Sequence, residues 1–176
     1  MTDYIFKFMY LINRISLTDS FTSLHMGTCA ERIIARSGIS REEQDAYSEQ
    51  SYARARAAWA RGAYKDEVSP ITIGETEISQ DEEFSNSPST FAALRPLFER
   101  PEVGSVTFGN TSKLGDGAVA TLLFSEEALK THSVTPIARI VGHADAAMES
   151  IDFTTAVVLA IEKLFSKYKG AHNKRH

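Results

Sequence analysis

The chain has 176 residues, 43% of them hydrophobic, and a formal net charge of −4 at pH 7. This composition provides for one hydrophobic core, with room for a smaller lobe, and its acidic balance argues against a general nucleic-acid-binding surface. Cys29 is the single cysteine, which excludes an intramolecular disulfide framework and favours a reducing compartment such as the cytosol or the mitochondrial matrix.

The opening segment, MTDYIFKFMYLINRI, is apolar and aromatic but is interrupted by Lys7. It is too short to cross a bilayer, and with Asp3 near its start and no small-residue cleavage pattern it lacks the features of a secretory signal. It resembles a matrix-targeting peptide only weakly. We expect residues 1–15 to form an atypical leader, and we expect no membrane partner.

A short helix is predicted over residues 29–37. Thr28 and Glu31 have the spacing of a capping box, and Gly38 offers a left-handed stop. Cys29 lies at the start of this helix, where the helix dipole would favour a thiolate nucleophile. A lone helical cysteine more often packs as a small apolar side chain, and we expect packing here.

A longer helix is predicted from a second capping box, Ser40 with Glu43, up to Gly62. Small residues recur on one of its faces at helical spacing, and that face is expected to pack closely against another segment. The face consists of Tyr47, Ser51, Ala55 and Ala58, and the other face carries Glu49, Arg56 and Arg61.

The stretch after this helix is predicted to be mostly a polar connection. EVSPITI, residues 67–73, has the pattern of a short β segment. Residues 74–90 are rich in acids, Ser and Pro, so we expect no packed element there and solvent-exposed acids at 81–83.

From residue 104 the pattern changes to β segments around a helix. GSVTFGN, residues 104–110, is β-like, and TSKLGDG, residues 111–117, has the residues of a turn. AVATLLFS, residues 118–125, predicts a strand or a buried segment. EEALKTHS then predicts a helix capped by Ser125, and TPIARIVGHADA, residues 135–146, predicts a further strand. The order strand, helix, strand implies a right-handed parallel unit. A last helix is predicted in TTAVVLAIEKLFSKY, residues 154–168, and a basic, solvated tail follows it. One face of this helix is apolar and consists of Val157, Ile161, Leu164 and Tyr168.

The segment GNTSKLGDGA is the main candidate for ligand binding by motif. Its glycines and hydroxyl side chains would allow backbone N–H groups to approach a phosphate or a thioester. The spacing matches neither the Walker nor the dinucleotide fingerprint, so from spacing alone a plain turn is favoured. The five histidines lack metal-ligand spacing, and no Ser/His/Asp or Cys/His set can be assembled.

The following segments occur in order: SLTDSF, HMGTCAE, ISREEQDAYSEQSYARARAAW, GAYKDEVSPI, DEE, LRPLF, GSVTFGNTSKLGDGA and TPIARIVGHADAAMESIDF. In them the chain resembles the thiolase family over about residues 16–165, in particular its acetyl-CoA acetyltransferase branch of mitochondrial type. The resemblance implies an α/β, thiolase-like fold that is partial: a helical loop domain plus an incomplete βαβ core half. It assigns 1–15 to the leader, 16–103 to the loop domain, 104–150 to the end of the N-terminal core half, and 151–176 to the start of the C-terminal half and a basic tail.

The resemblance also implies a site for coenzyme A or acetyl-CoA. By the resemblance, Leu17, His25 and Met26 line the pantetheine and acyl channel. The further contacts that it implies are Tyr52, Ser112 and, near the adenine end, Thr90. Tyr52, Gly109 and Thr111 match positions that hold a potassium ion in the mitochondrial-type enzymes. Backbone carbonyls beside a Tyr hydroxyl suit such a hard, weakly hydrated cation.

The chain departs from the family pattern near this site. Phe108 stands where the family has alanine, so a ring there is expected to crowd the coenzyme. Thr111 replaces a small alanine, and Gly115 replaces the asparagine of NDGA. Ser85 and Asn86 stand in place of the basic residue expected after the acidic cluster, which would weaken the hold on the nucleotide phosphates or adenine.

Thiolase chemistry needs a Cys thiolate, an activating His, a second Cys and oxyanion donors. The family has its nucleophile before this region and its Asn-Glu-Ala-Phe, Gly-His-Pro and Cys-x-Gly motifs after it, and the chain contains none of these. We therefore predict no catalytic residue. The expected function is that of an acetyl-CoA acetyltransferase fragment, inactive alone, whose parent reaction converts two acetyl-CoA to acetoacetyl-CoA and CoA through a Cys thioester.

Two alternatives remain open. The chain is a non-catalytic module that binds coenzyme A or assembles with itself or with a full-length thiolase, or it is an incomplete gene model in which residues 1–15 and 169–176 come from non-coding sequence. By resemblance the compartment is the mitochondrial matrix, or the cytoplasm because no clear transit peptide is present. An incomplete core half also predicts exposed strand edges and a marginal, aggregation-prone monomer.

Overall fold

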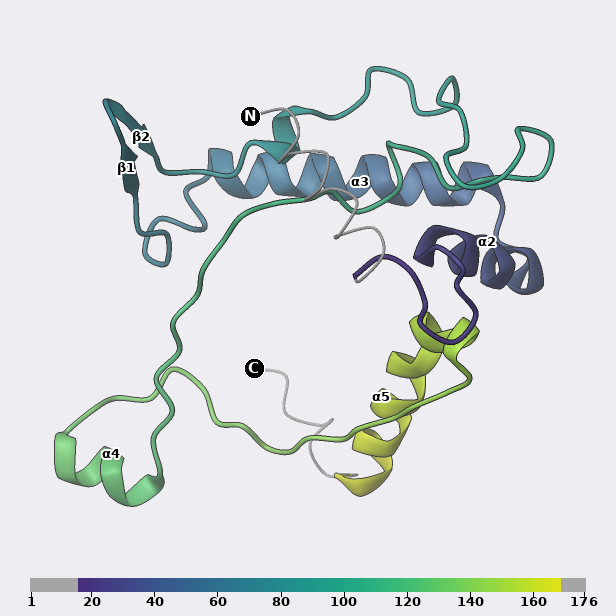
Figure 1. Ribbon diagram of the computed structural model, residues 1–176. Coiled ribbons are helices and arrows are strands. Elements are labelled where there is room, and N and C mark those ends of the chain that lie inside the picture. The colour runs from purple at the N-terminus through teal and green to yellow at the C-terminus, as the bar shows by residue number, and fades with distance from the viewer. Residues whose placement is uncertain (1–15, 169–176) are drawn as a thin grey trace. The chain divides into compact units, whose positions relative to one another are not determined.

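The chain divides into two units, Met1–Lys113 and Leu114–His176, of which the computed structural model describes residues 16–168 (Figure 1). The first unit contains α2 (Met26–Ser37), α3 (Arg41–Ala60), β1 (Ile71–Ile73), β2 (Thr76–Ile78) and the 3-10 turn η1 (Glu83–Ser85). The second contains α4 (Glu126–His132), the 3-10 segment η2 (Ser150–Thr155) and α5 (Ala156–Lys167). The expected leader 1–15 and the tail from residue 169 lie outside the described residues.

Helix α2 begins three residues earlier than predicted, after an N-cap at His25. The Nδ1 atom of His25 accepts a hydrogen bond from the backbone N–H of Gly27 at 3.0 Å. The expected capping box of Thr28 and Glu31 is wrong, because Thr28 lies inside the first turn and the Glu31 carboxylate turns inward. Gly38 ends the helix as predicted, with φ of 67° and its N–H donating to the Ile34 carbonyl.

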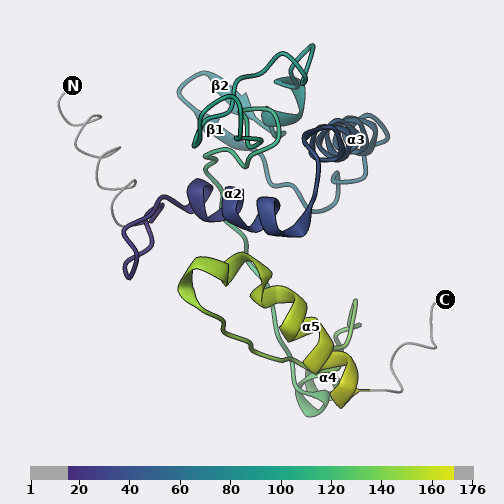
Figure 2. The ribbon, with the colours of Figure 1, turned by 90° about the vertical axis from the view of Figure 1, so that its right-hand side faces the viewer.

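Helix α3 begins with the predicted capping box. Ser40 Oγ accepts from the Glu43 N–H at 3.1 Å, and Glu43 Oε2 accepts from the Ser40 N–H at 2.8 Å. Figure 2 shows α3 end-on and α2 lengthwise, so the two helices run in clearly different directions.

The packed side of α3 differs in part from the expected face of small residues. Ala58 is buried and Ala55 half-buried, as expected, but Tyr47 is 72% exposed and Ser51 is exposed as well. The covered side instead includes Asp45 and Tyr52. These polar side chains have partners in distant segments, and those contacts rotate the covered side away from the face that helical spacing alone predicted.

The β segment predicted within residues 67–73 forms as β1, whereas the connector 74–90 contains two elements that the sequence did not predict, β2 and η1. β1 and β2 pair antiparallel, with Ile71 opposite Ile78, around a turn in which Gly74 has φ of 62°. η1 packs on α3, where the Phe84 ring stacks on Trp59 with centroids 5.8 Å apart. The expectation of no packed element is therefore wrong, because one aromatic side chain anchors an otherwise polar segment. Of the acids at 81–83, Glu83 is half-buried and the other two are exposed.

In the second unit the predicted helices form, but the predicted strands do not. Ser125 Oγ accepts from the Ala128 N–H and caps α4 as expected. Within residues 16–168 the sheet consists of β1 and β2 alone, so 118–125 and 135–146 remain unpaired, and 104–110 contributes only the bridge of Thr107 to Pro96. Because strands are stable only beside a partner, the expected parallel unit is absent from the described residues. Many apolar side chains are correspondingly exposed, including Val119 at 93%, Leu122 at 85% and Ile137.

Helix α5 presents a different side from the one expected. Val157 and Ile161 are 59% and 45% exposed, whereas Leu164 and Tyr168 are half-buried. The Tyr168 ring lies against Gly142, where an added Cβ would come within 2.2 Å of it, and this contact sets the covered side of the helix. No helix in the described part of the chain has the length and apolarity to cross a membrane.

The first unit is organised around the buried carboxylate of Glu31, which is 6% exposed. It accepts hydrogen bonds from the Ser105 N–H at 2.9 and 3.0 Å, from the Ser105 hydroxyl at 2.9 Å and from the Val106 N–H at 2.8 Å. Hydrogen bonds to an ionised acceptor are stronger than neutral ones, and each donor here would otherwise be buried without a partner. The contact therefore fixes α2 to the start of the segment 104–113.

Arg41 and Asp45 of α3 form a second connection within this unit. Arg41 Nε donates to Asp45 Oδ2 at 2.8 Å, and Arg41 Nη2 donates to the carbonyls of Phe91 and Leu94 at 2.8 and 3.1 Å. The Phe91 side chain below them is 2% exposed. A single guanidinium thus holds the turn at residues 91–94 against the start of α3.

Asn110 extends this network into the segment 104–113. Its Nδ2 donates to Asp45 Oδ1 and to the Ser105 carbonyl, both at 3.0 Å, and its Oδ1 accepts from the Thr107 N–H at 2.7 Å. Gly109 lies so close to the 91–94 turn that an added Cβ would be 2.6 Å from Leu94 and 2.8 Å from the Phe91 ring. The segment therefore takes one conformation, although it forms neither helix nor strand.

We predict that Glu31→Gln lowers the free energy of unfolding by about 2–3 kcal/mol, because the new amide N–H₂ faces donors and leaves buried N–H groups without an acceptor. Urea unfolding followed by fluorescence of Trp59, the only tryptophan, measures this. Glu49→Gln, on an exposed position of α3, is the matched control and should change stability by less than about 0.5 kcal/mol. Equal stabilities of the two variants would contradict the role assigned to Glu31.

Candidate functional site

Three of the predicted coenzyme A residues lie together at the N-terminus of α2. Thr18 and His25 form an isolated antiparallel bridge, and the Met26 N–H donates to the Leu17 carbonyl at 2.8 Å. Leu17, His25 and Met26 are all half-buried. The turn between residues 17 and 26 thus brings these three half-buried residues next to one another, and we call them the surface at the start of α2.

Two residues that the sequence analysis did not single out hold this surface. Asp19, 7% exposed, accepts from the N–H of Thr22 at 2.7 Å and from its hydroxyl. The Phe98 ring stacks on His25 with centroids 4.7 Å apart. Gly27 makes this stacking possible, because an added Cβ there would be 2.3 Å from the ring. The sequence signal for Asp19 is the Asp-x-x-Thr spacing of an Asx-type turn, whereas Phe98 has no local signal.

The other three predicted coenzyme A residues, Tyr52, Thr90 and Ser112, lie on other segments of the described chain. Thr90 and Ser112 are exposed and make no side-chain hydrogen bond within residues 16–168. Tyr52 lies on the covered side of α3, edge-on to Phe91 with centroids 6.0 Å apart. Of the six residues, three are therefore assembled locally, and Ser112 offers a free hydroxyl on the segment 104–113.

Of the three predicted potassium ligands, Thr111 contacts the ammonium of Lys113 directly, Tyr52 reaches it only through Glu83, and Gly109 packs instead against Phe91 and Leu94. Its Nζ donates to the carbonyls of Phe108 and Thr111, the latter at 3.1 Å. Nζ also lies 4.0 Å from the centroid of the Phe108 ring and 3.8 Å from Glu83 Oε1. The Lys113 side chain is 14% exposed, so this cation is largely withdrawn from water.

The hydroxyl of Tyr52 belongs to the same cluster. It donates to Glu83 Oε1, the oxygen that faces Lys113, at 2.8 Å. Burial, then the hydrogen bond to Glu83 and the charge of that carboxylate, raise the pKa of Tyr52 to about 12. The phenol therefore keeps its proton at neutral pH and acts as a hydrogen-bond donor.

This arrangement does not fit a potassium ion. The Thr111 carbonyl already accepts from an ammonium, and the Tyr52 hydroxyl points its proton at Glu83. A metal cation bound to these groups would lie beside a second positive charge, with which it would compete for the same oxygens. No group of three or more His, Cys, Asp or Glu side chains suited to a metal ion occurs among the described residues either.

The expectation that Cys29 packs is confirmed. Cys29 is 0% exposed. Burial, with a smaller effect from the charge of Asp19, raises the pKa of its thiol. A protonated, inaccessible thiol is unsuited to nucleophilic attack, so the cysteine fills space in α2.

The residues that depart from the family pattern differ in how closely other side chains surround them. Phe108 is 51% exposed and has the Lys113 ammonium over its ring, so the ring covers a cation. Ser85 and Asn86 are exposed at the end of η1. Gly115 lies in open space, with no atom within 4 Å of an added Cβ.

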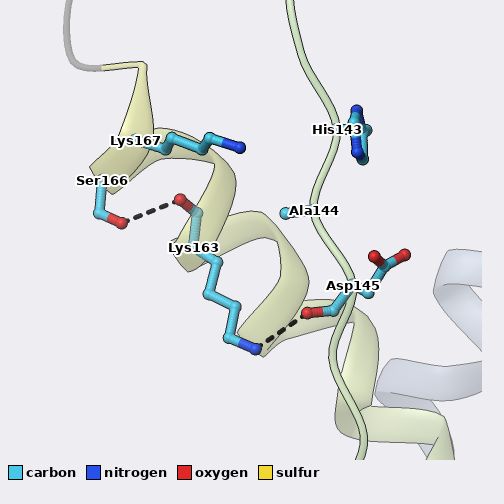
Figure 3. A pocket seen from close by; sticks show the side chains of 6 residues that line it. All are labelled: His143, Ala144, Asp145, Lys163, Ser166 and Lys167. Atoms are coloured by element: carbon cyan, nitrogen blue, oxygen red, sulfur yellow. Dashed lines mark hydrogen bonds between the residues drawn. The ribbon is translucent and has the colours of Figure 1, made fainter.

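The second unit has an open depression of about 350 Å³ between α5 and the segment 143–145. Figure 3 shows its lining, in which Lys163 reaches across to donate to the Asp145 carbonyl at 2.9 Å while the Asp145 carboxylate points away from the helix. His143 and Lys167 add two further basic side chains. The sequence gives no signal for this depression, because the residues that line it come from two separate segments and form no recognisable motif.

Comparisons with known proteins give consistent matches. The family model "Thiolase, N-terminal domain" matches residues 6–127. The chain is 42% identical to acetyl-CoA acetyltransferase A, mitochondrial, of Xenopus laevis and 44% identical to the mitochondrial acetyl-CoA acetyltransferase of Homo sapiens, over 89% and 85% of its length. It spans only 39% and 36% of these two relatives. Among solved structures, the Acat5 thiolase of Ascaris suum in complex with coenzyme A matches 90% of this chain and 41% of its own, with a TM-score of 0.86 and 36% identity.

We predict that the Cys29 thiol of the native chain reacts slowly with an aromatic disulfide reagent. Its full burial blocks access, and its raised pKa keeps it protonated. The rate in denaturant is the internal control and should be faster by about a hundredfold or more. Equal rates in the native and denatured chains would show that Cys29 is accessible and would reopen its candidacy as a nucleophile.

We predict that Glu83→Gln lowers the pKa of Tyr52 from about 12 towards its usual value, because the variant lacks the carboxylate charge. The difference in tyrosinate absorbance between each protein and its Tyr52→Phe counterpart gives this titration. Since the folded-state pKa is raised, the neutral phenol stabilises the fold below about pH 10. This contribution is lost as the pH rises through about 12. Glu82→Gln, at the exposed neighbouring residue, should leave the titration unchanged.

Proposed function

The chain belongs to the thiolase family, whose N-terminal domain matches residues 6–127, and we propose that it forms part of an acetyl-CoA acetyltransferase. The parent reaction in this proposal joins two acetyl-CoA into acetoacetyl-CoA and CoA. The observation that carries it is the 42–44% identity to mitochondrial acetyl-CoA acetyltransferases over 85–89% of the chain. The likeness to a thiolase solved with coenzyme A supports the same ligand class.

In this proposal residues 16–103 form the loop domain, 104–150 the end of the N-terminal core half, and 151–176 the start of the C-terminal half. The contacts of Glu31 and Asn110 support a close association of the first two parts, since they bind residues 105–107 to α2 and α3. The first unit accordingly extends to Lys113, ten residues into the second assigned part.

The surface at the start of α2 is proposed to contact the pantetheine arm of the coenzyme. Leu17 and Met26 offer apolar contact for its alkyl portions. Because the Nδ1 atom of His25 accepts from Gly27, a neutral imidazole carries its proton on Nε2, where it is a donor for an amide or thioester carbonyl. Ser112, Tyr52 and Thr90 remain proposed contacts at other parts of the coenzyme.

The chain is proposed to provide walls of the site and not the reacting thiol. In the parent reaction a Cys thiolate attacks the thioester carbonyl of acetyl-CoA, takes the acetyl group and releases the CoA thiolate. The single cysteine here is fully buried, with a raised pKa. We therefore propose that the chain alone does not catalyse acyl transfer.

A second candidate function is a binding or assembly module, and the second unit favours it. Its unpaired segments expose large apolar side chains that a further polypeptide would cover, among them Val119, Leu122 and Ile137. The proposed partner is a full-length thiolase or another copy of this chain. The proposed compartment is the mitochondrial matrix, following the names of the relatives.

We predict that the chain binds coenzyme A by isothermal titration and that His25→Asn weakens binding by about tenfold, or 1.4 kcal/mol. Asparagine is a good N-cap, so the variant removes the imidazole while retaining a cap for α2. His143→Asn, in the second unit, is the matched control and should bind as the unaltered chain does.

An absence of coenzyme A binding by a folded chain would contradict the proposal. Acetoacetyl-CoA thiolysis by the purified chain that disappears in Cys29→Ala would contradict the assignment of the reacting thiol. Size-exclusion chromatography of the chain mixed with a full-length acetyl-CoA acetyltransferase tests the second candidate, for which co-elution is expected.

A further inference from the structure

We propose that the Lys113 ammonium takes the place of a bound monovalent metal ion, so that the segment 104–113 carries its own cation and needs no potassium. The inference concerns this segment of the chain and does not depend on the proposed acyl-transfer function. It replaces the potassium site suggested by Tyr52, Gly109 and Thr111 with a covalently attached charge.

The surroundings of the ammonium are those of a cation site. An ammonium has three N–H donors and no acceptor. Two carbonyls, of Phe108 and Thr111, accept from it. The ring face of Phe108, at 4.0 Å, and the Glu83 carboxylate, at 3.8 Å, lie close by. Carbonyl oxygens and an aromatic face both attract cations through their negative partial charge, so the cluster provides the partners that this charge requires.

The ammonium is held within the fold, unlike the ammonium of a surface lysine. Its side chain is 14% exposed, whereas Lys130, paired with Glu126 on α4, is 75% exposed. Taking a cation out of water is unfavourable unless oxygen or π partners replace the water. Phe108 supplies both kinds of partner, its carbonyl and its ring, which gives this departure from the family pattern a role.

The cation also connects two segments of the first unit. Glu83 of η1 faces Lys113 and accepts from Tyr52 of α3, while the neighbouring Phe84 stacks on Trp59. Removing the positive charge would leave the carbonyls of Phe108 and Thr111 without their donor and Glu83 without its counter-charge. The segment 104–113 and η1 should then both loosen, and the freed carbonyls would be available to a free monovalent cation.

Hydrogen exchange on the full chain tests this, with peptides covering residues 104–112, in potassium chloride and in tetramethylammonium chloride of equal concentration. For the unaltered chain we expect equal exchange in the two salts. For Lys113→Met we expect exchange faster by about tenfold in tetramethylammonium chloride and slowed again by potassium. Lys130→Met, the matched control in the second unit, should behave as the unaltered chain does.

Two results would overturn the proposal. One is potassium-dependent protection in the unaltered chain, which would show that the metal ion binds despite the ammonium. The other is unchanged exchange in Lys113→Met in tetramethylammonium chloride, which would show that the ammonium holds nothing in place. If Lys113→Met does not fold, the unaltered chain alone tests the proposal. A segment with its own cation should exchange at the same rate in the two salts, whereas a metal site should exchange more slowly in potassium chloride.

Discussion

The first unit depends on the buried carboxylate of Glu31, which accepts four hydrogen bonds from a distant part of the chain. Ser105 and Val106, more than seventy residues further along, direct two backbone N–H groups and a hydroxyl at its two oxygens. Asn110 and Asp45 then secure the next residues to α3. A segment without helix or strand thereby acquires a single conformation from side chains placed on helices.

The same segment binds charges of opposite sign at its two ends. At residues 105 and 106 its N–H groups face an anion, the Glu31 carboxylate, and at residues 108 and 111 its carbonyls face a cation, the Lys113 ammonium. Gly109 lies between them, packed against Phe91 and Leu94 with no space for a side chain. The peptide dipoles of a short loop thus satisfy a buried anion and a largely covered cation, and Ser112 on the same loop is exposed.

Local signals in the sequence predicted what local interactions determine. The caps at Ser40 and Ser125 and the stop at Gly38 depend on atoms within four residues, and all three were predicted correctly. Glu31 was misassigned because its spacing from Thr28 also fits a capping box, and only the tertiary fold reveals Ser105 as its partner. The strands expected at 118–125 and 135–146 have suitable side chains, but a strand also needs a neighbour.

The position of Lys113 at the boundary between the units has a consequence for how the first unit ends. The backbone passes from this residue directly into Leu114, the first residue of the second unit. The Lys113 side chain does not follow the backbone but reaches back to the carbonyls of Phe108 and Thr111. The side chain and the backbone of residues 108–113 thus close on themselves, so the first unit ends in a stretch that its own last side chain holds in place.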